Sequence, residues 1–268
     1  MFGALIGDII GSRFEFFNNI TGKEFDLFNE DCRFTDDSVM TIAICKALMD
    51  CNGIYDILSQ KVIENMQYLG ELYPRAGYGG MFWDWLRDEN PKPYNSFGNG
   101  AAMRVSSVAY EAISIDEVKK LSKLVTEVTH NHPEGIKGAE AVAVAIFLAR
   151  IGKDKKQIKE YIEKNYYTLD FSIDEIKENY SFDETCQGSV PQALECFFES
   201  TDFEDAIRIA ISLGGDSDTI AAITGSIAEA YYGIPTHIKE SAICYLDDYL
   251  YDIVKKFEMY YLNKQKIN

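Results

Sequence analysis

Long hydrophobic runs are missing from this chain of 268 residues. No stretch approaches the roughly 18 to 20 consecutive apolar residues that a membrane-spanning helix needs. The amino terminus is apolar, but it has no cationic head and Asp8 lies within it, so it does not have the pattern of a secretory signal peptide. We therefore expect a cytoplasmic protein that has no membrane partner.

Cysteine and histidine do not occur in metal-binding patterns. The six cysteines and three histidines include no C-x-x-C pair and no histidine at the spacing of a zinc site. Neither a disulfide framework nor a structural zinc is indicated, and most of the thiols are expected to be buried in a reducing compartment. The cysteines are Cys32, Cys45, Cys51, Cys186, Cys196 and Cys244.

Basic residues are in short supply. The chain has 26 Lys and Arg against 43 Asp and Glu, which gives a formal net charge of −17. Nucleic-acid binding needs clustered Lys and Arg, and the Lys-rich stretch at 153–164 is mixed with Glu. We expect no nucleic-acid partner. A hydrophobic content of 47% suits a globular protein, and we expect residues 1–268 to form a single, monomeric domain.

Alternating β-branched runs bounded by turns are also absent, so the sequence predicts an all-α protein. Apolar residues recur at helical spacing, and capping boxes begin at Ser114, Asp154 and Ser172. Pro191 is expected in the first turn of its helix, and Thr201 is expected to cap the next helix. The predicted helices cover residues 35–47, 54–72, 99–112, 114–129, 133–150, 188–199, 201–213 and 236–262, and two more begin near 154 and 172.

Glycine recurs every four residues in the first predicted helix, at Gly3, Gly7 and Gly11. On a helix these residues form one row, which allows another helix to approach closely. Three glycines cost about 1 kcal/mol each relative to alanine, and tight backbone packing would offset that cost. Glu15 is the next member of the row. It is expected either at the end of this close-packed seam, as a functional carboxylate, or exposed at a fraying helix end.

Two acidic segments with hydroxyl residues stand at predicted helix starts. They are Gly214-Gly215-Asp216-Ser217-Asp218-Thr219 and Thr35-Asp36-Asp37-Ser38. If the two helix starts meet, four carboxylates converge, and each pair of charges about 4 Å apart repels by roughly 4 kcal/mol at an effective dielectric near 20. A divalent cation or protonation must relieve that repulsion. Because oxygen-only ligands favour Mg²⁺, Mn²⁺ or Ca²⁺, we expect a hard cation.

Two further segments are candidates for ligand binding. Residues 73–100 combine many glycines, prolines and aromatic residues, which suits either a flat ligand with phosphates or an aromatic core cluster with turns. His130 and His132 lie two residues apart before a helix. A substrate contact, a capping or packing role and a zinc site are the alternatives, and the zinc site is the least favoured because the two side chains point in different directions.

Taken together, these segments resemble the ADP-ribosylglycohydrolase family, which includes the dinitrogenase-reductase-activating glycohydrolases. Each motif is weak alone, but five in the family's order span nearly the whole chain. The motifs that carry the resemblance are Gly3-Ala-Leu-Ile-Gly-Asp8 with Glu15, Thr35-Asp36-Asp37, Ser96-Phe97-Gly98-Asn99-Gly100, Thr129-His130-Asn131-His132-Pro133 and Gly214-Gly215-Asp216-Ser217-Asp218-Thr219.

The resemblance implies an all-α orthogonal helical bundle with two Mg²⁺ or Mn²⁺ ions, acting on ADP-ribosylated proteins or ADP-ribose-containing small molecules. The implied metal ligands are Thr35, Asp36, Asp37, Asp216, Asp218 and Thr219. The implied substrate-binding residues are Gly77, Gly79, Ser96, Phe97, Gly98, Asn99, Gly100 and His130. For the carboxylate that moves a proton at an oxocarbenium-like transition state, Glu15, Asp36 and Asp216 all stay open.

The linkage that is cleaved is the least determined feature. We expect arginine-linked ADP-ribose, because a guanidinium pairs with carboxylates and stacks on aromatic rings. The residues that favour an arginine linkage are Trp83, Asp84, Trp85, Asp88 and Glu89. The alternative is that the two tryptophans belong to the core and the acidic residues are solvated. The rival interpretations are a non-catalytic ADP-ribose-binding or crystallin-like relative, another metal-dependent hydrolase of ADP-ribose derivatives, and a glycosyltransferase or metal phosphatase, whose D-x-D motif would follow a strand.

Overall fold

The computed structural model describes residues 1–15 and 22–265. Within these ranges the chain has no strand, and its single β-type pairing is a bridge between Gly98 and Thr185. The predicted all-α class is confirmed. The elements are α1 (Phe2–Gly11), α2 (Asp36–Cys51), the 3-10 helix η1 (Tyr55–Ile57), α3 (Leu58–Leu72), α4 (Gly80–Leu86), α5 (Gly100–Met103), α6 (Val108–Glu111), α7 (Ile115–Thr126), α8 (Pro133–Arg150), α9 (Lys155–Asn165), α10 (Ile173–Ile176), α11 (Cys186–Glu199), α12 (Phe203–Leu213), α13 (Ser217–Tyr232), α14 (Thr236–Ile243) and α15 (Asp248–Gln265).

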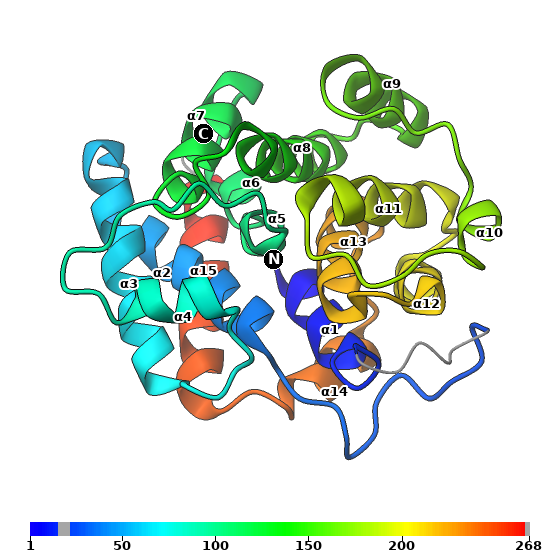
Figure 1. Cartoon of the computed structure of the whole chain (residues 1–268), viewed down its shortest axis with the longest axis horizontal. Coiled ribbons are helices and arrows are strands. Elements are labelled where there is room, and N and C mark those ends of the chain that lie inside the picture. Colours follow the sequence, from blue (N-terminus) through cyan, green and yellow to red (C-terminus); the bar gives the residue numbers. More distant parts are fainter. Residues whose placement is uncertain (16–21, 266–268) are drawn as a thin grey trace.

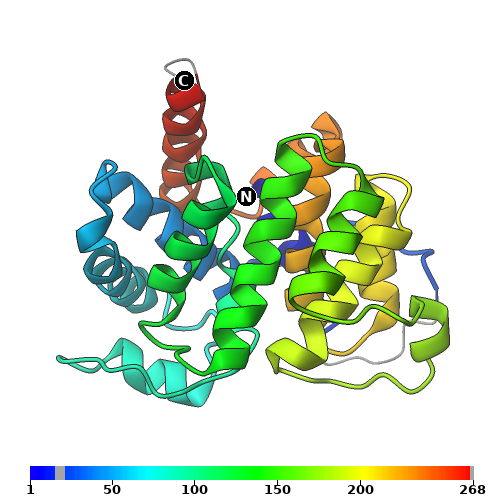
Figure 2. The same cartoon turned by 90° about the horizontal axis from the view of Figure 1, so that it is seen from above.

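Helices α1 and α13 form the centre of the molecule, with α2, α3 and α15 on one side and α11 and α12 on the other (Figures 1 and 2). The glycine row explains how closely the two central helices approach. A Cβ at Gly7 would lie 2.0 Å from the carbonyl oxygen of Ala221, and one at Gly11 would lie 2.5 Å from Cα of Asp218. The predicted tight helix contact is confirmed, and it brings the end of α1 to the start of α13.

Local capping signals fix several helix starts. The Thr35 side chain accepts a hydrogen bond from the N–H of Asp37 at the start of α2. The predicted capping boxes at Asp154 and Ser172 are both present, and Ser114 accepts from the N–H of Glu117. Each of these side chains satisfies one N–H group that the first helical turn leaves without a partner.

Two of the predicted long helices are interrupted. The helix predicted over 99–112 is instead α5 and α6, because the turn between them buries Arg104 and directs it to Thr129. The helix predicted over 236–262 is α14 and α15, and Asp247 between them accepts from the N–H of Leu250 in the first turn of α15. In both cases the apolar residues continue at helical spacing, but a tertiary contact or a new helix cap divides the segment into two helices.

Three predicted helix starts need correction. Helix α11 begins at Cys186, because Thr185 accepts from the N–H of Gly188, and Pro191 therefore lies inside the helix. Asp202, and not Thr201, caps α12. Residues 55–57 form a 3-10 turn before α3. Helix α1 ends at Gly11, so Glu15 lies in the following turn and is not the next helical member of the glycine row.

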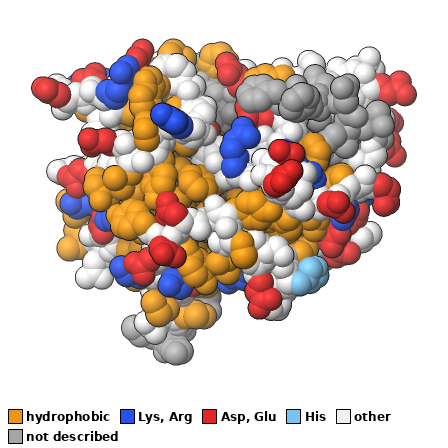
Figure 3. All heavy atoms as spheres, turned by 90° about the horizontal axis from the view of Figure 1, so that it is seen from below, with side chains coloured by type: hydrophobic (Ala, Val, Ile, Leu, Met, Phe, Trp, Pro, Cys, Tyr) orange, Lys and Arg blue, Asp and Glu red, His pale blue; other side chains and the backbone are white. Residues whose placement is uncertain are grey.

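The outer surface carries mixed charge. Figure 3 shows Asp and Glu side chains spread over the face seen from below, with Lys and Arg among them, and hydrophobic side chains gathered on the side of α3, α4 and α15. The cysteines lack disulfides, and all but Cys244 are buried, as predicted. Across the described ranges, no helix combines the length and the apolar character that crossing a bilayer requires.

Candidate active site

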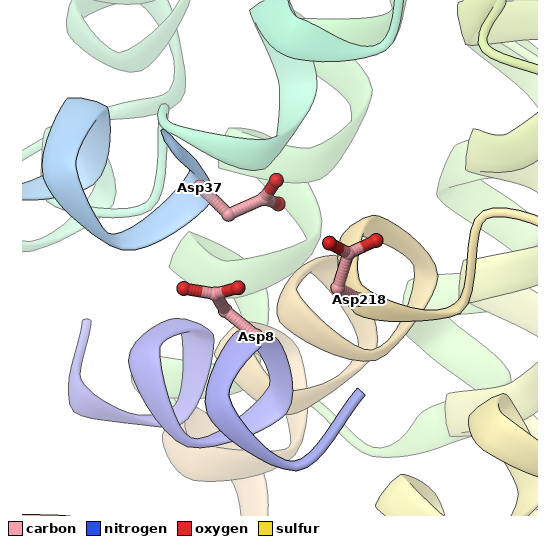
Figure 4. A group of neighbouring side chains, drawn as sticks. All are labelled: Asp8, Asp37 and Asp218. Atoms are coloured by element: carbon pink, nitrogen blue, oxygen red, sulfur yellow. The ribbon is translucent and has the colours of Figure 1, made fainter. Parts of the chain in front are cut away.

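Carboxylates from three helices meet beside the α1–α13 contact. Figure 4 shows Asp8 of α1, Asp37 of α2 and Asp218 of α13 pointing toward one another. Oxygen atoms of these three residues lie within 4.8 Å of each other, and oxygen atoms of Glu15, Asp216 and Asp218 form a second such group. The two predicted acidic helix starts therefore do meet. We call these five residues, with Asp36, the acidic cluster.

The start of α13 is shaped by two glycines in the left-handed region. Gly214 has φ of 79° and Gly215 has φ of 73°, conformations that residues with a side chain rarely adopt. A Cβ at Gly215 would also lie 2.6 Å from the Tyr180 ring. The chain thus turns sharply after α12, and Asp216 and Asp218 are delivered to the first turn of α13.

Burial governs the protonation of the cluster. It raises the pKa of Asp36 to about 7, with smaller contributions from the charges of Asp8, Asp216 and Glu15. It likewise raises the pKa of Glu15 to about 7, assisted by the charge of Asp216. The pKa values of Asp37 and Asp218 are raised well above the ordinary range, first by burial and then by neighbouring carboxylates. Without a cation, the cluster therefore holds protons at neutral pH.

The donor atoms fit a hard cation. Oδ1 of Asp37 is buried and has no hydrogen-bond partner among the described residues, while Oδ2 accepts from the Thr219 hydroxyl at 3.1 Å. A buried carboxylate oxygen without a donor needs a compensating charge. Since the surrounding ligands are carboxylate and hydroxyl oxygens, a divalent cation such as Mg²⁺ or Mn²⁺ suits the cluster better than zinc or copper.

Asp8 is a cluster member that sequence reasoning did not assign to the site. Its carboxylate is fully buried and accepts from the N–H and hydroxyl of Thr35, at 2.9 and 2.6 Å, and from the N–H and hydroxyl of Ser38. It therefore ties α1 to the start of α2. The available signal was a lone charge in an apolar segment, one residue after Gly7.

A loop joins the acidic cluster to the rest of the cleft. Asn99 donates from its side-chain amide to Oδ2 of Asp216 at 2.6 Å, and both residues are buried. Gly98 bridges to Thr185, and its N–H donates to the Ser96 hydroxyl at 3.1 Å. The N–H of Gly98, a residue that the family resemblance implies in substrate binding, is thus already used within the loop.

Most predicted site residues line one cleft. Thr35 and Phe97 do not: Thr35 is buried behind Asp8, and Phe97 is exposed, with its ring 5.2 Å from the His132 ring. Gly77 has φ of 109°, and a Cβ there would lie 3.4 Å from Oδ1 of Asp36. The predicted residues that line the cleft are Glu15, Asp36, Asp37, Gly77, Gly79, Ser96, Gly98, Asn99, Gly100, His130, Asp216, Asp218 and Thr219.

The two neighbouring histidines have separate roles. His132 caps α8 by accepting from the N–H of Glu134 at 3.1 Å, whereas His130 is buried at the wall of the cleft. Neither belongs to a metal-binding group among the described residues. The capping alternative is therefore confirmed for His132, and the zinc alternative has no support.

The residues at 83–89 on which the arginine prediction was based do not line the cleft. Trp85 is buried, and Trp83, Asp88 and Glu89 line a neighbouring hollow between α3 and α4. The Arg87 guanidinium already lies 4.9 Å from the Trp83 ring. The cleft is also lined by Met81, Phe82 and Tyr94 of the predicted ligand-binding segment 73–100, and by Arg104, Phe182 and Glu184, which the sequence did not point to.

The comparison with known proteins decides the family. The sequence model of the ADP-ribosylglycohydrolase family matches residues 1–265. The chain belongs to this family. The predicted resemblance is thus confirmed, and this family member is a glycohydrolase enzyme.

Relatives of this family member cover most of its length. ADP-ribosylhydrolase ARH3 of Homo sapiens is 26% identical over 311 residues, which are 87% of this chain and 84% of that protein. ADP-ribosylarginine hydrolase Tri1 of Pseudomonas putida is 28% identical over 162 residues, 56% of this chain and 43% of that protein. A solved ADP-ribosylglycohydrolase-related protein complex has the same fold, with a TM-score of 0.65 and 22% identity over 91% of this chain and 92% of its own.

Proposed function

We propose that this glycohydrolase cleaves the bond between ADP-ribose and a modified protein side chain, with two divalent cations, Mg²⁺ or Mn²⁺, in the acidic cluster. One observation carries the proposal. The buried, unpartnered Asp37 oxygen belongs to the acidic cluster, and Asp216 of the same cluster is joined to the Ser96–Gly100 loop by its hydrogen bond with Asn99. A cation site and a ligand-binding loop are thereby parts of one cleft.

The residues suited to hold the cations are Asp36, Asp37, Asp216, Asp218 and Thr219, which line the cleft. Bound there, divalent ions would supply Lewis-acid polarisation of hydroxyl and water oxygens. Thr35 serves from behind the cluster, since its hydroxyl donates to Asp8 at 2.6 Å and holds the start of α2 in place. We assign to Gly77, Gly79, Ser96, Asn99, Gly100 and His130 the contacts with the ADP-ribose group.

Glu15 is our first choice for the proton-transferring carboxylate. Burial raises its pKa to about 7 in the metal-free protein, and it lines the cleft beside Asp216 and Asp218, where a general acid or base is needed. It is only partly buried, so a solvent proton can reach it. Asp36 has a similar pKa, and we assign it to the cations instead. Asp216 already accepts from Asn99.

We further propose arginine-linked ADP-ribose as the preferred substrate, now on different residues. The exposed side chains of Phe182 and Glu184 lie at the rim of the cleft, where a guanidinium can stack on a ring and pair with a carboxylate. The relative Tri1 carries the name of an ADP-ribosylarginine hydrolase, which agrees with this choice. We also propose that residues 1–268 act as one domain, because the first helix packs on α13 and the last on α2.

The test is a parallel assay on arginine-, serine- and poly-ADP-ribosylated proteins, with Mg²⁺, with Mn²⁺ and after chelation. We expect arginine-linked substrate to be cleaved, activity to disappear on chelation, and Asp37→Ala and Asp218→Ala to lose at least about 100-fold. Release from serine alone would overturn the arginine assignment. Full activity without metal would overturn the metal assignment. ADP-ribose binding with no turnover of any substrate would support a non-catalytic relative.

A further inference from the structure

Arg104 is a buried cation beneath the cleft. Its side chain is 1% exposed and is the largest fully buried one among the described residues. Among the described residues no carboxylate forms an ion pair with it, and its Nε has no hydrogen-bond partner. Burying an unpaired guanidinium is costly, so packing alone is a poor reason for its presence. Among the described residues its hydrogen bond goes to Thr129, and its guanidinium lies 5.6 Å from the centre of the Phe82 ring.

That contact begins a chain of hydrogen bonds with a defined direction. Nη2 of Arg104 lies 2.7 Å from the Thr129 hydroxyl oxygen, which lies 2.7 Å from Nδ1 of His130. Arginine can only donate, so the Thr129 oxygen accepts from it. The Thr129 proton can go to His130 or to the Thr126 carbonyl, but the carbonyl is 3.4 Å away, too long for a good O–H···O bond.

The shorter contact favours a Thr129 proton directed at Nδ1, and that arrangement would fix the imidazole tautomer. Nδ1 accepts, so in the neutral ring Nε2 carries the hydrogen. Burial, followed by the charge of Arg104, holds the pKa of His130 well below its usual range, which keeps the ring neutral. Burial also lowers the pKa of Arg104 to about 10, so the guanidinium remains charged at neutral pH.

Nε2 of His130 faces the ligand-binding loop. A Cβ placed on Gly98 or on Gly100 would lie 3.5 Å from this nitrogen, and all three residues line the cleft. No described protein group accepts a hydrogen bond from Nε2. A Cβ on Gly135 would lie 3.2 Å from the His130 Cβ, so the start of α8 passes close to the backbone side of His130.

We propose that Arg104 is a positioning residue that acts through Thr129 to hold His130 as an Nε2–H donor toward an oxygen of the diphosphate–ribose part of bound ADP-ribose. The inference rests on the proposed function. It assigns roles to Arg104 and Thr129, and it fixes the orientation and tautomer of His130. A neutral imidazole suits this cleft because the carboxylates of the acidic cluster cannot remove its N–H proton, whereas they could deprotonate an imidazolium ion.

The tautomer can be observed directly in the free protein. The chain has three histidines, so ¹⁵N-detected imidazole spectra can be assigned with His132→Gln and His237→Gln variants. We expect His130 to show a protonated Nε2 and an unprotonated Nδ1, and Thr129→Val to populate both tautomers. A His130 with a protonated Nδ1 in the wild-type protein, or one unchanged by Thr129→Val, would overturn the proposal.

The consequence for the ligand is measured as ADP-ribose affinity by calorimetry. Thr129→Val should raise the Kd about 5- to 10-fold, the size expected for one neutral hydrogen bond. Thr129→Ser keeps the hydroxyl and should retain both the wild-type tautomer and the wild-type Kd. Thr224→Val is the matched control. It also removes a buried threonine hydroxyl, which donates to the Ala193 carbonyl at 2.9 Å, but Thr224 does not line the cleft. An equal rise in Kd for Thr224→Val would assign the effect to lost packing.

Arg104 itself is tested by Arg104→Lys and Arg104→Met, with circular dichroism to verify folding. We expect Arg104→Met to reproduce the tautomer mixture of Thr129→Val, and Arg104→Lys to restore the wild-type spectrum in part, since lysine also donates. If Arg104→Met weakens ADP-ribose binding while His130 keeps its tautomer, Arg104 acts by its charge alone. That result would refute the proposed chain of hydrogen bonds. If Arg104→Met does not fold, the three threonine variants decide.

These outcomes separate this inference from the proposed function. Hydrolysis and ADP-ribose binding that do not depend on Thr129 would overturn only the hydrogen-bond chain. The expected tautomer and a Thr129-dependent Kd, without hydrolysis of any ADP-ribosylated protein, would overturn only the proposed function. A wild-type protein that does not bind ADP-ribose would overturn both.

Discussion

Asn99 and Asp216 are joined by a buried hydrogen bond of 2.6 Å, although 117 residues separate them in sequence. Asn99 immediately precedes α5, and Asp216 immediately precedes α13. The bond therefore couples the position of the ligand-binding loop to the position of a carboxylate in the acidic cluster. It also uses the charge of Asp216, because a hydrogen bond to a carboxylate is stronger than one between neutral groups.

Asn99→Ala should impair both stability and activity. Losing a hydrogen bond to a charged group costs about 1.5–3 kcal/mol, and Asp216 would also be free to move away from the cluster. We expect a lower midpoint in urea unfolding and at least about a tenfold loss of turnover.

The matched control for this change is Asn65→Ala. Asn65 of α3 is buried too, and its side-chain amide donates to the carboxylate of Asp50 at 3.0 Å. It should show a similar loss of stability with normal turnover. Normal turnover in Asn99→Ala would mean that the loop keeps its position without the bond.

Gly7→Ala should destabilise the fold strongly. The added methyl group would lie 2.0 Å from the carbonyl oxygen of Ala221, and relief requires two central helices to separate. We expect a loss of about 3 kcal/mol, near the upper end for overpacking. Gly80→Ala meets nothing within 4 Å and has an ordinary φ, so it should leave stability nearly unchanged. Chemical denaturation of both variants checks the difference, and equal midpoints would contradict the close seam.

Features encoded in short segments could be predicted from the sequence. The row of Gly3, Gly7 and Gly11 predicted the helix contact, because a repeat of four places residues on one face whatever the rest of the chain does. The polar segment Thr35-Asp36-Asp37-Ser38 ahead of an apolar helical pattern predicted the start of α2 and its charge. The glycines before Asp216 similarly predicted the turn that delivers the second acidic group.

Features that depend on distant contacts could not be predicted. Arg104 interrupts a helical pattern because its partner, Thr129, arrives from another part of the chain. Asp8 gives no local sign that it will meet Thr35 and Ser38. Trp83 and its acidic neighbours have a suitable composition for a guanidinium, but the orientation of α4 turns them into the hollow next to the cleft. Composition indicates which chemistry is available, and only packing decides where it faces.

The metal-free protein should become less stable as the pH rises. Burial raises the pKa values of Asp36 and Glu15 to about 7 in the folded state, above those of the unfolded chain. The folded chain therefore binds more protons than the unfolded chain between about pH 4 and about pH 7, and the free energy of unfolding from these groups falls across this window. After chelation, the Tm should decrease from about pH 4 to about pH 7.

Added Mg²⁺ or Mn²⁺ should reverse this trend, because cations compete with the bound protons. The gain in Tm on adding metal should grow with pH over the same window. Asp36→Asn isolates the cluster from the other titrating groups: it removes one raised pKa, so its chelated form should lose less stability with pH than the wild type. A wild type and an Asp36→Asn variant with identical pH profiles would show that the cluster does not control the dependence.

Glu15→Gln should separate catalysis from metal binding. The amide keeps the shape of the side chain but cannot take up or release a proton, so turnover should fall by about 10²- to 10⁴-fold. Stability without metal should not fall, because the change removes a charge that lies near Asp216 and Asp218. The Tm gain on adding Mg²⁺ is the second readout. If the Tm gain persists while turnover is lost, Glu15 moves a proton. If the Tm gain and turnover are lost together, Glu15 serves the metal site. Unchanged turnover would leave Asp36 as the remaining candidate with a pKa near 7.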